Sequence, residues 1–223
     1  MIENRFKKVS VSKTFKNLKE VFLLGDKFVF DIGCGYGEYL SSFGTGSFGI
    51  TTTKEEVDYG RENGLDIRLG NAEMTDPSLF SNLPEVIWAN NLFEHLLSPH
   101  EFLINLKRIS NTDTILILGV PVVPFPSFIM KLKWFRGALA SNHISFFTRK
   151  TLSLSAEYSG WKVKEIRPFI FKSKIIDNIV SVFAPHQYLV AQNNKDFRYP
   201  PKKLKEWSGE KRYSGLIDIV DGK

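Results

Sequence analysis

Short apolar runs alternate along the chain with longer segments that carry helix signals. The runs typical of strands lie at residues 28–32, 47–51, 66–70, 85–90, 114–120, 161–169 and 186–194. Helices are predicted at residues 37–44, 53–64, 98–109 and 148–160. Strands that alternate with helices in this way indicate an α/β fold with a mainly parallel sheet.

Two of these helices carry recognisable start and stop signals. Thr53 followed three residues later by Glu56 predicts a capping box, and Gly64 is expected to end the same helix. Ser98 and Pro99 are typical of the N-cap and the first position of the next helix. The apolar residues of that helix fall at helical spacing and are expected in the core: Phe102, Leu103, Leu106 and Ile109.

The two ends and one internal segment depart from the regular pattern. Residues 1–27 are basic and are predicted to form a helical extension, whereas residues 198–223 are predicted to form a polar tail. Residues 121–142 are rich in proline and aromatic residues and are expected to be irregular. The chain between these ends, residues 28–197, is expected to form one domain.

Composition narrows the class of protein. Hydrophobic residues make up 43% and charged residues 24% of the 223 residues, which is typical of a soluble globular domain. Cys34 is the only cysteine, which excludes a disulfide within the chain and suits a reducing compartment. No apolar leader opens the chain and no unbroken run of 18 apolar residues occurs. We therefore expect a cytoplasmic protein without a transmembrane segment.

The charge balance bears on the partner. A formal net charge of +6 favours an anionic partner. Much of the excess lies near the two ends of the chain, where a solvated surface explains it equally well. Nucleic acid is therefore a candidate partner that is not favoured, because no RNA-binding module is recognisable. Nothing in the sequence indicates the oligomeric state.

The stretch "VFDIGCGYGEYL" is the main candidate for binding chemistry. Asp31 ends an apolar strand, and glycines follow at positions 33, 35 and 37. Without Cβ atoms, such a turn lets a ligand approach the backbone closely. The order D-x-G-x-G-x-G differs from the dinucleotide pattern, since the carboxylate would repel a pyrophosphate and hold a cationic amino group. The ligand implied is a nucleoside that carries an amino acid, and the alternative is a tight turn with no ligand.

From about residue 28 to 195 the sequence resembles the class I S-adenosylmethionine-dependent methyltransferases. The resemblance rests on "VFDIGCGYGEYL", "WANNLFEHLLSPHEFLINLKRIS", "LILGVP" and "NHISFFTRKTLSLSAEYSGWKV", the last two similar to the branch with ubiquinone O-methyltransferases. It implies a Rossmann-like three-layer sandwich with a mainly parallel seven-stranded sheet. The last strand of this fold runs antiparallel, and residues 186–194 are expected to form it.

The resemblance also implies S-adenosylmethionine as cofactor and a set of residues that bind it. Those expected around its methionine part and ribose are Asp31, Gly33, Cys34, Gly35 and Gly37. Those expected against the adenine are Asn71, Ala72 and Glu73, and those expected under the sulfonium are Asn90, Asn91 and Leu92.

One position departs from the family pattern. The family carries an acidic residue for the ribose hydroxyls at the end of the second strand, and this sequence has Thr51 there, followed by Thr52. Both threonines remain candidates for ribose binding. A neutral hydrogen bond contributes about 0.5–1.5 kcal/mol against about 1.5–3 for a charged one, so the change is expected to weaken binding about tenfold.

Candidates for catalysis follow the fourth strand, at the edge where open α/β sheets bind ligands. His95 could act as a general base if the methyl acceptor is a hydroxyl. Glu94 and His95 could instead bind a divalent cation, as in some ubiquinone-type relatives, or hold the loop to the next helix. Two ligands are too few to specify a metal, so none is predicted. His143 could face the pocket or cap a helix, whereas His100 is expected in solvent and His186 in a loop.

The resemblance places an acceptor-side insertion or lid at residues 121–142. Apolar residues that could form such a lid are Phe125, Phe128, Met130, Trp134 and Phe135, and a basic rim could come from Lys131, Lys133 and Arg136. A packed helix or a peripheral membrane contact explains the same residues. The expected function is methyl transfer to a small molecule, on oxygen, with an anionic or lipid-linked acceptor as one option. The alternatives are an RNA or protein acceptor and a non-catalytic binding protein, which Thr51 would suit.

Overall fold

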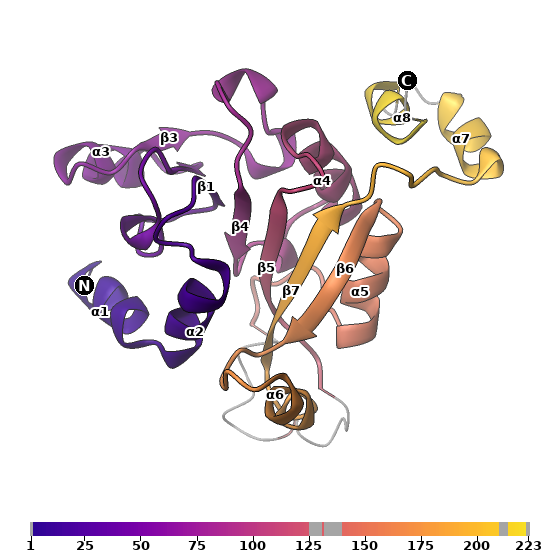
Figure 1. Cartoon of the computed structure of the whole chain (residues 1–223). Helices are drawn as coiled ribbons and strands as arrows, with labels where there is room; N and C mark the ends of the chain where they lie inside the picture. The colour runs from indigo at the N-terminus through magenta and orange to yellow at the C-terminus, as the bar shows by residue number, and fades with distance from the viewer. Residues whose placement is uncertain (1, 125–130, 132–139, 210–213, 222–223) are drawn as a thin grey trace.

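A seven-stranded sheet forms the middle layer of the computed structural model, which describes residues 2–124, 131, 140–209 and 214–221. The strand order is β3-β2-β1-β4-β5-β7-β6 (Figure 1). The strands are β1 Val29–Ile32, β2 Phe48–Thr51, β3 Ile67–Leu69, β4 Val86–Asn90, β5 Ile115–Pro121, β6 Trp161–Arg167 and β7 His186–Asn193. β7 runs antiparallel to β5 and β6, and the other pairs are parallel. The predicted fold, with its antiparallel last strand, is confirmed.

Two separate cores cover the two faces of this sheet, because successive residues of a strand point to opposite faces. Ile87 of β4 packs in the larger core with helices α4 (Pro99–Leu106) and α5 (Arg149–Glu157). Trp88, the next residue, packs in the second core with α2 (Lys13–Phe22). The remaining helices are α1 Ile2–Val11, α3 Lys54–Glu62, α6 Lys174–Val180, α7 Pro201–Ser208 and α8 Ser214–Asp221.

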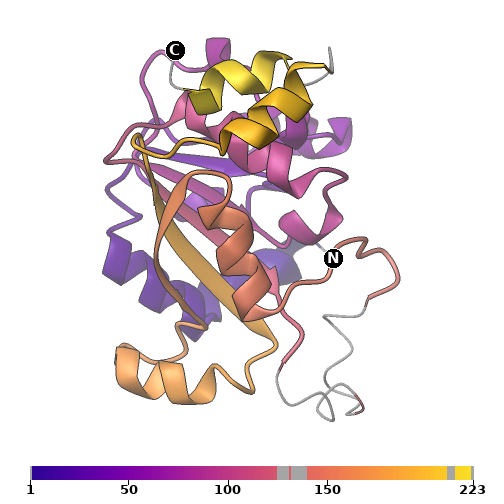
Figure 2. The ribbon, with the colours of Figure 1, turned by 90° about the vertical axis from the view of Figure 1, so that its right-hand side faces the viewer.

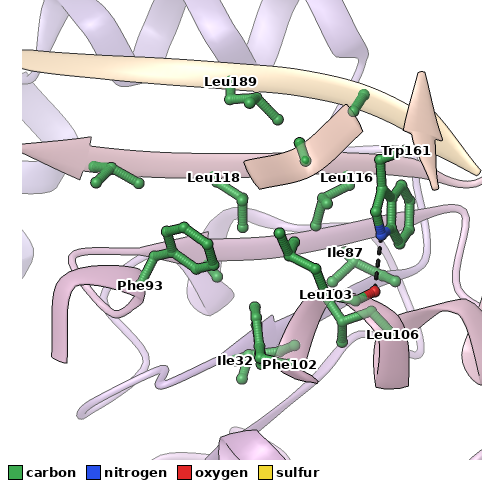
Figure 3. Close-up of a cluster of buried hydrophobic side chains, with 14 of the residues drawn as sticks. Ile32, Ile87, Phe93, Phe102, Leu103, Leu106, Leu116, Leu118, Trp161 and Leu189 are labelled. Carbon is green, nitrogen blue, oxygen red and sulfur yellow. Dashed lines mark hydrogen bonds between the residues drawn. The ribbon is translucent and has the colours of Figure 1, made fainter. Parts of the chain in front are cut away.

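The larger core confirms the residues predicted for it. The side chains expected from helical spacing are all fully buried: Phe102, Leu103, Leu106 and Ile109. Trp161, at the start of β6, reaches across to α4, and its indole N–H donates to the Leu103 carbonyl at 2.8 Å (Figure 3). This hydrogen bond joins the edge strand to the helix that covers the middle of the sheet.

The helix predicted at residues 37–44 is wrong. Gly33, Gly35 and Gly37 have φ angles of 72°, 58° and 87°, which a right-handed helix does not allow. The chain therefore leaves β1 through a series of turns, and only a single 3₁₀ turn, Leu40–Ser42, follows. This unwound segment keeps the glycines at the carboxyl edge of the sheet.

The capping box predicted for α3 does not form. Thr53 stands at the N-cap, but its side chain accepts no capping hydrogen bond. The Glu56 carboxylate instead accepts a hydrogen bond from the hydroxyl of Thr51, at the end of β2. Ser98 also lacks a side-chain cap at the start of α4, and its backbone N–H donates to Glu73 Oε1 at 2.7 Å.

The polar tail predicted at residues 198–223 contains two helices that pack on the domain. Tyr199 and Leu216 are buried against Ile104 of α4, and Figure 2 shows α7 and α8 together at one end of the molecule. His100 of α4 contacts the Tyr199 hydroxyl and lies 2.9 Å from Ser159 Oγ, and burial lowers its pKa. The expectation that His100 is solvated is therefore wrong.

Most of the predicted lid lies outside the described residues. Of residues 121–142, the structure describes 121–124, 131 and 140–142. The residues named for the lid that fall outside are Phe125, Phe128, Met130, Lys133, Trp134, Phe135 and Arg136. None of the helices in the described part of the chain has both the length and the apolar character that a membrane crossing requires.

Replacement of Trp161 by phenylalanine should destabilise the fold, because it leaves the buried Leu103 carbonyl without its donor. We expect a loss of about 1–3 kcal/mol beyond the loss of packing. Trp88→Phe is the matched control, since Trp88 is equally buried and its indole N–H has no hydrogen-bond partner among the described residues. Urea unfolding of both variants measures the difference, and equal losses would show that the bond to Leu103 contributes nothing.

Candidate functional site

The ends of β1, β2 and β4 lie side by side, because β1 is paired with both of the other strands. The backbone N–H groups of Gly33 and Cys34 donate to the Ile50 carbonyl of β2 at 2.9 and 3.1 Å. These bonds hold the glycine turn against the neighbouring strand. The topology thus brings Asp31, Thr51 and Asn90 to one edge of the sheet, as the sequence predicted.

The glycine turn borders residues of the candidate site on one side and has a packed side against a small apolar cluster. A Cβ atom on Gly33 would lie 3.1 Å from Leu92 Cδ1, and one on Gly35 would lie 3.0 Å from Glu38 Oε2. Both positions are therefore lined by side chains of the candidate site. Leu92 comes from the segment after β4, so the structure places it beside the glycine turn, and its expected role under the sulfonium stays a prediction.

Gly37 and Cys34 belong to the packed side. A Cβ atom on Gly37 would lie 2.8 Å from Leu65 Cδ1, within a small apolar cluster. The Cys34 side chain is buried in the same cluster, and burial raises the pKa of its thiol. Any contact of Gly37 or Cys34 with a ligand would involve the backbone, and their predicted role stays a prediction.

Two buried carboxyl groups stand behind the turn. Asp31 is 2% exposed and Glu38 is 6% exposed, and Asp31 Oδ2 has no hydrogen-bond partner among the described residues. Burial, and then repulsion by Glu38, raise the pKa of Asp31 well above its usual value. A buried carboxylate without a partner is costly in free energy, and a cation bound beside it would remove that cost.

Helix α1 lies over this turn. Arg5 forms an ion pair with Glu38, and its guanidinium carbon lies 5.2 Å from the centre of the Tyr36 ring. The Tyr36 hydroxyl in turn donates to Glu55 Oε1 of α3 at 2.7 Å. Arg5 was not predicted, because residues 1–27 were expected to form an extension and no local pattern links Arg5 to the glycines. Glu38 directly follows Gly37 and was not predicted because residues 37–44 were assigned to a helix.

The end of β2 carries a carboxylate despite the threonine there. Thr51 is 6% exposed, donates to Glu56 and accepts a hydrogen bond from the Thr53 N–H at 3.3 Å. Thr52 is exposed. The sequence analysis assigned Glu56 to a helix cap, whereas its side chain reaches back to the position where the family has an acid.

The segment after β4 is tied to both neighbouring parts of the site. The Asn90 amide donates to the Tyr39 hydroxyl at 3.2 Å, and Asn90 Oδ1 is buried without a partner among the described residues. Asn91 has a φ of 52°, and its Oδ1 lies 2.9 Å from His186 Nε2. Burial lowers the pKa of His186 to about 4, so its imidazole is neutral near pH 7.

His186 therefore lies at the edge of the site, and its prediction as a loop residue is wrong, because it opens β7. A cavity of about 320 Å³ adjoins the segment after β4, with Tyr39, Asn91, His186 and Tyr188 in its wall. Burial raises the pKa values of both tyrosines, that of Tyr39 to about 12. The side chains of Tyr39, His186 and Tyr188 are thus uncharged near neutral pH.

The residues expected against adenine lie between β3 and α4. The Asn71 side chain accepts from the Glu73 N–H at 2.9 Å and starts a 3₁₀ turn, Ala72–Met74. Glu73 Oε1 accepts from the Ser98 N–H, so this carboxylate also holds the start of α4. The three residues are placed at the same edge of the sheet, and their contact with a ligand stays a prediction.

Glu94, His95 and His143 form a second cluster of polar side chains. The Nε2 atoms of His95 and His143 lie 3.8 and 3.9 Å from Glu94 Oε1. Glu94 is 1% exposed, neither of its oxygens has a hydrogen-bond partner among the described residues, and burial raises its pKa. One atom from each of the three side chains lies within 4.8 Å of the others, a donor set that could hold a divalent cation.

His143 is therefore a third possible metal ligand. The prediction of no metal considered only Glu94 and His95. The same cluster also fastens a loop. The Glu94 carbonyl accepts from the Ile144 and Ser145 N–H groups at 3.1 and 3.0 Å, and His95 Nδ1 lies 3.0 Å from the Asn142 carbonyl. Base, metal ligand and anchor all remain compatible with these contacts.

Comparison with family models decides the family. A model described as "Methyltransferase domain" matches residues 2–166. The chain belongs to this methyltransferase family. Class I members use S-adenosylmethionine, and the chain is an S-adenosylmethionine-dependent methyltransferase of that class. A search of curated proteins found no match.

Solved structures show the same fold at low sequence identity. A chain from a Haloferax volcanii complex that contains the Trm112 methyltransferase activator and a methyltransferase is 15% identical, with a TM-score of 0.61, over 87% of this chain and 95% of that one. A Thermotoga maritima SAM-dependent methyltransferase is 14% identical, with a TM-score of 0.59, over 86% and 95%. The CcbJ methyltransferase from Streptomyces caelestis is 12% identical, with a TM-score of 0.61, over 82% and 89%.

Replacement of Asp31 by asparagine should stabilise this methyltransferase at neutral pH. Because burial raises the pKa of Asp31 in the folded state, ionisation of Asp31 lowers stability as the pH rises through that pKa. We expect a gain of about 1–3 kcal/mol at pH 8, which shrinks as the pH falls toward the unfolded pKa of about 4.

Thermal unfolding between pH 5 and pH 8 measures this gain. Asp177→Asn is the matched control, since Asp177 is also fully buried but accepts from Arg167 Nη1 at 2.8 Å and should lose stability. An Asp31→Asn protein that is less stable than the wild type at pH 8 would show that the carboxylate is already satisfied.

Proposed function

We propose that this methyltransferase transfers the methyl group of S-adenosylmethionine to an oxygen atom of a small molecule. The observation that carries the proposal is the buried carboxylate of Asp31 before the glycine turn, whose Oδ2 has no hydrogen-bond partner among the described residues. A ligand with a positive charge next to a nucleoside would supply the missing partner. The cofactor implied by the family has both an ammonium and a sulfonium group.

The other side chains at this edge fit the rest of the cofactor. Gly33 and Gly35 carry no side chain that could stand between the backbone and the cofactor, and a Cβ atom at either would crowd Leu92 or Glu38. Glu56, held by the Thr51 hydroxyl, is placed to accept hydrogen bonds from ribose hydroxyls. This carboxylate would restore the charged acceptor that Thr51 lacks, which argues against a binding protein that has lost the cofactor.

The chemistry required of the protein is mainly positioning. When bound, the cofactor supplies a sulfonium whose methyl carbon bonds to the acceptor oxygen while the carbon–sulfur bond breaks and its electron pair stays on sulfur. Asn90, Asn91 and Leu92 would orient the two reactants, and such orientation contributes up to about 7–11 kcal/mol. The proton of an acceptor hydroxyl must pass to a base, and His95 or His143 could take it.

A cavity in the structure favours a small molecule as the acceptor. Apolar side chains dominate a cavity of about 730 Å³, lined in part by Val122, Pro124 and Val163, with Arg149 and Lys150 also in its wall. An apolar wall beside cationic groups suits an anionic or lipid-linked acceptor. The net charge of +6 keeps RNA or an acidic protein as the second candidate class.

Loss of the Asp31 charge, or a side chain at Gly35, should weaken cofactor binding. Asp31→Asn is expected to raise the dissociation constant for S-adenosylmethionine at least tenfold, in a protein that is more stable at neutral pH. Gly35→Ala should weaken binding similarly, because the added Cβ would lie 3.0 Å from Glu38 Oε2 at a φ of 58°.

Isothermal titration calorimetry with the wild type and both variants tests the proposal. Gly46→Ala is the control for backbone strain, since Gly46 also has a positive φ of 83° and its Cβ would meet nothing within 4 Å. No binding of S-adenosylmethionine to the wild type, or equal binding by Asp31→Asn, would overturn the proposal.

His95→Gln separates the three roles left open for the second cluster. A general base predicts a turnover about 10²-fold lower, with cofactor affinity unchanged and the rise of rate with pH abolished. A metal role predicts loss of activity with a chelator and recovery with an added divalent cation. An anchor predicts lower thermal stability and an unaltered pH profile.

The measurement is the pH–rate profile of both proteins, with and without chelator. It uses an acceptor found by screening compounds with a labelled methyl donor. Full activity of His95→Gln with the wild-type pH profile would remove His95 from catalysis, and the same series on His143 would follow.

A further inference from the structure

An arginine from the first helix lies on the glycine turn. Arg5 Nη2 is 3.1 Å from the position that a Cβ atom on Gly35 would take, so the guanidinium borders the volume that the absent side chain leaves. Its Nε contacts Glu38, and the Tyr36 ring lies beside it. The Arg5 side chain is 51% exposed, so part of its donor set faces outward.

The position of the helix that carries Arg5 is determined by contacts on either side. Val9 of α1 is buried in the second core, and the Phe6 ring lies 6.0 Å from the Tyr59 ring of α3. These contacts hold α1 over the turn, with Arg5 next to Gly35. The placement is therefore built into the fold and does not depend on the Glu38 ion pair alone.

We propose that Arg5 binds the carboxylate of the amino-acid part of S-adenosylmethionine. The inference rests on the proposed function. An amino acid brings one positive and one negative charge, and Asp31 and Glu38 can take only the positive one. Arg5 supplies the opposite charge next to them, and a guanidinium has five N–H donors, enough to hold Glu38 and a ligand carboxylate together.

The arrangement thus selects a zwitterion. Two acids and one arginine around Gly35 match an ammonium and a carboxylate attached to one carbon atom. A ligand that keeps the adenosine and the ammonium but lacks the carboxylate would lose the contact with Arg5 and would be repelled by its charge. Specificity for the amino-acid part of the cofactor would therefore lie in helix α1, outside the glycine motif.

Three ligands and three variants test the proposal by calorimetry. The ligands are S-adenosylmethionine, its decarboxylated form, which lacks only the carboxylate, and 5′-methylthioadenosine, which lacks the amino-acid part. The variants are Arg5→Gln, Arg5→Lys and the control Lys8→Gln, which removes the same charge from an exposed residue of the same helix.

For Arg5→Gln we expect about tenfold weaker binding of S-adenosylmethionine, the low end for a charged hydrogen bond because Arg5 is half exposed. Binding of the decarboxylated form should be unchanged or tighter, and binding of 5′-methylthioadenosine should be unchanged. Arg5→Lys should recover part of the loss, since it keeps the charge without the planar fork. Lys8→Gln should behave like the wild type with all three ligands.

Several outcomes would overturn the proposal. Equal binding of S-adenosylmethionine by Arg5→Gln and the wild type would place the carboxylate elsewhere, and tighter binding would make the Arg5–Glu38 pair an obstruction. Equal weakening with S-adenosylmethionine and its decarboxylated form would mean that Arg5 acts through the position of α1. A wild-type protein that binds none of the three ligands would contradict the proposed function itself. This result differs from every outcome that contradicts only the role of Arg5.

Discussion

The rest of the site depends on a carboxylate that the fold buries without a partner. Asp31 is the last residue but one of the central strand β1, which is paired on both sides, and its side chain is 2% exposed. Glu38 lies close enough to raise its pKa further. The fold thus bears a free-energy cost at the point where a cationic ligand would be bound, as expected where stability gives way to function.

The sheet topology turns this single charge into a composite site. Because β1 lies between β2 and β4, the ends of both neighbours reach the same edge, and each brings polar side chains. Glu56 arrives from α3 through its bond to Thr51, and Asn90 arrives with Tyr39 from the glycine segment. Helix α1 then places the guanidinium of Arg5 beside the glycine turn. Segments far apart in the sequence therefore supply the complementary charges.

Local patterns predicted the parts of the molecule that local patterns determine. Every strand, the buried face of α4 and the glycine turn follow from apolar spacing and from residues with special backbone freedom. The helix predicted at residues 37–44 is wrong because the turn begun by Gly33 and Gly35 continues through Gly37, whose φ is also positive. Arg5, Glu56 and the placement of His143 beside Glu94 depend on contacts between distant segments, which spacing along the chain does not record.

The family match ends at residue 166, close to the end of β6. Residues 2–166 contain Arg5, Asp31 and Asn90, all the parts argued here for the cofactor. β7, with His186 bonded to Asn91, lies beyond that boundary, as do helices α6 to α8. A common cofactor requires one conserved geometry of charges, whereas each acceptor requires its own cavity. We therefore expect acceptor selection to involve both sides of residue 166, with Arg149 and Lys150 in the wall of the larger cavity and His186 and Tyr188 in the wall of the smaller one.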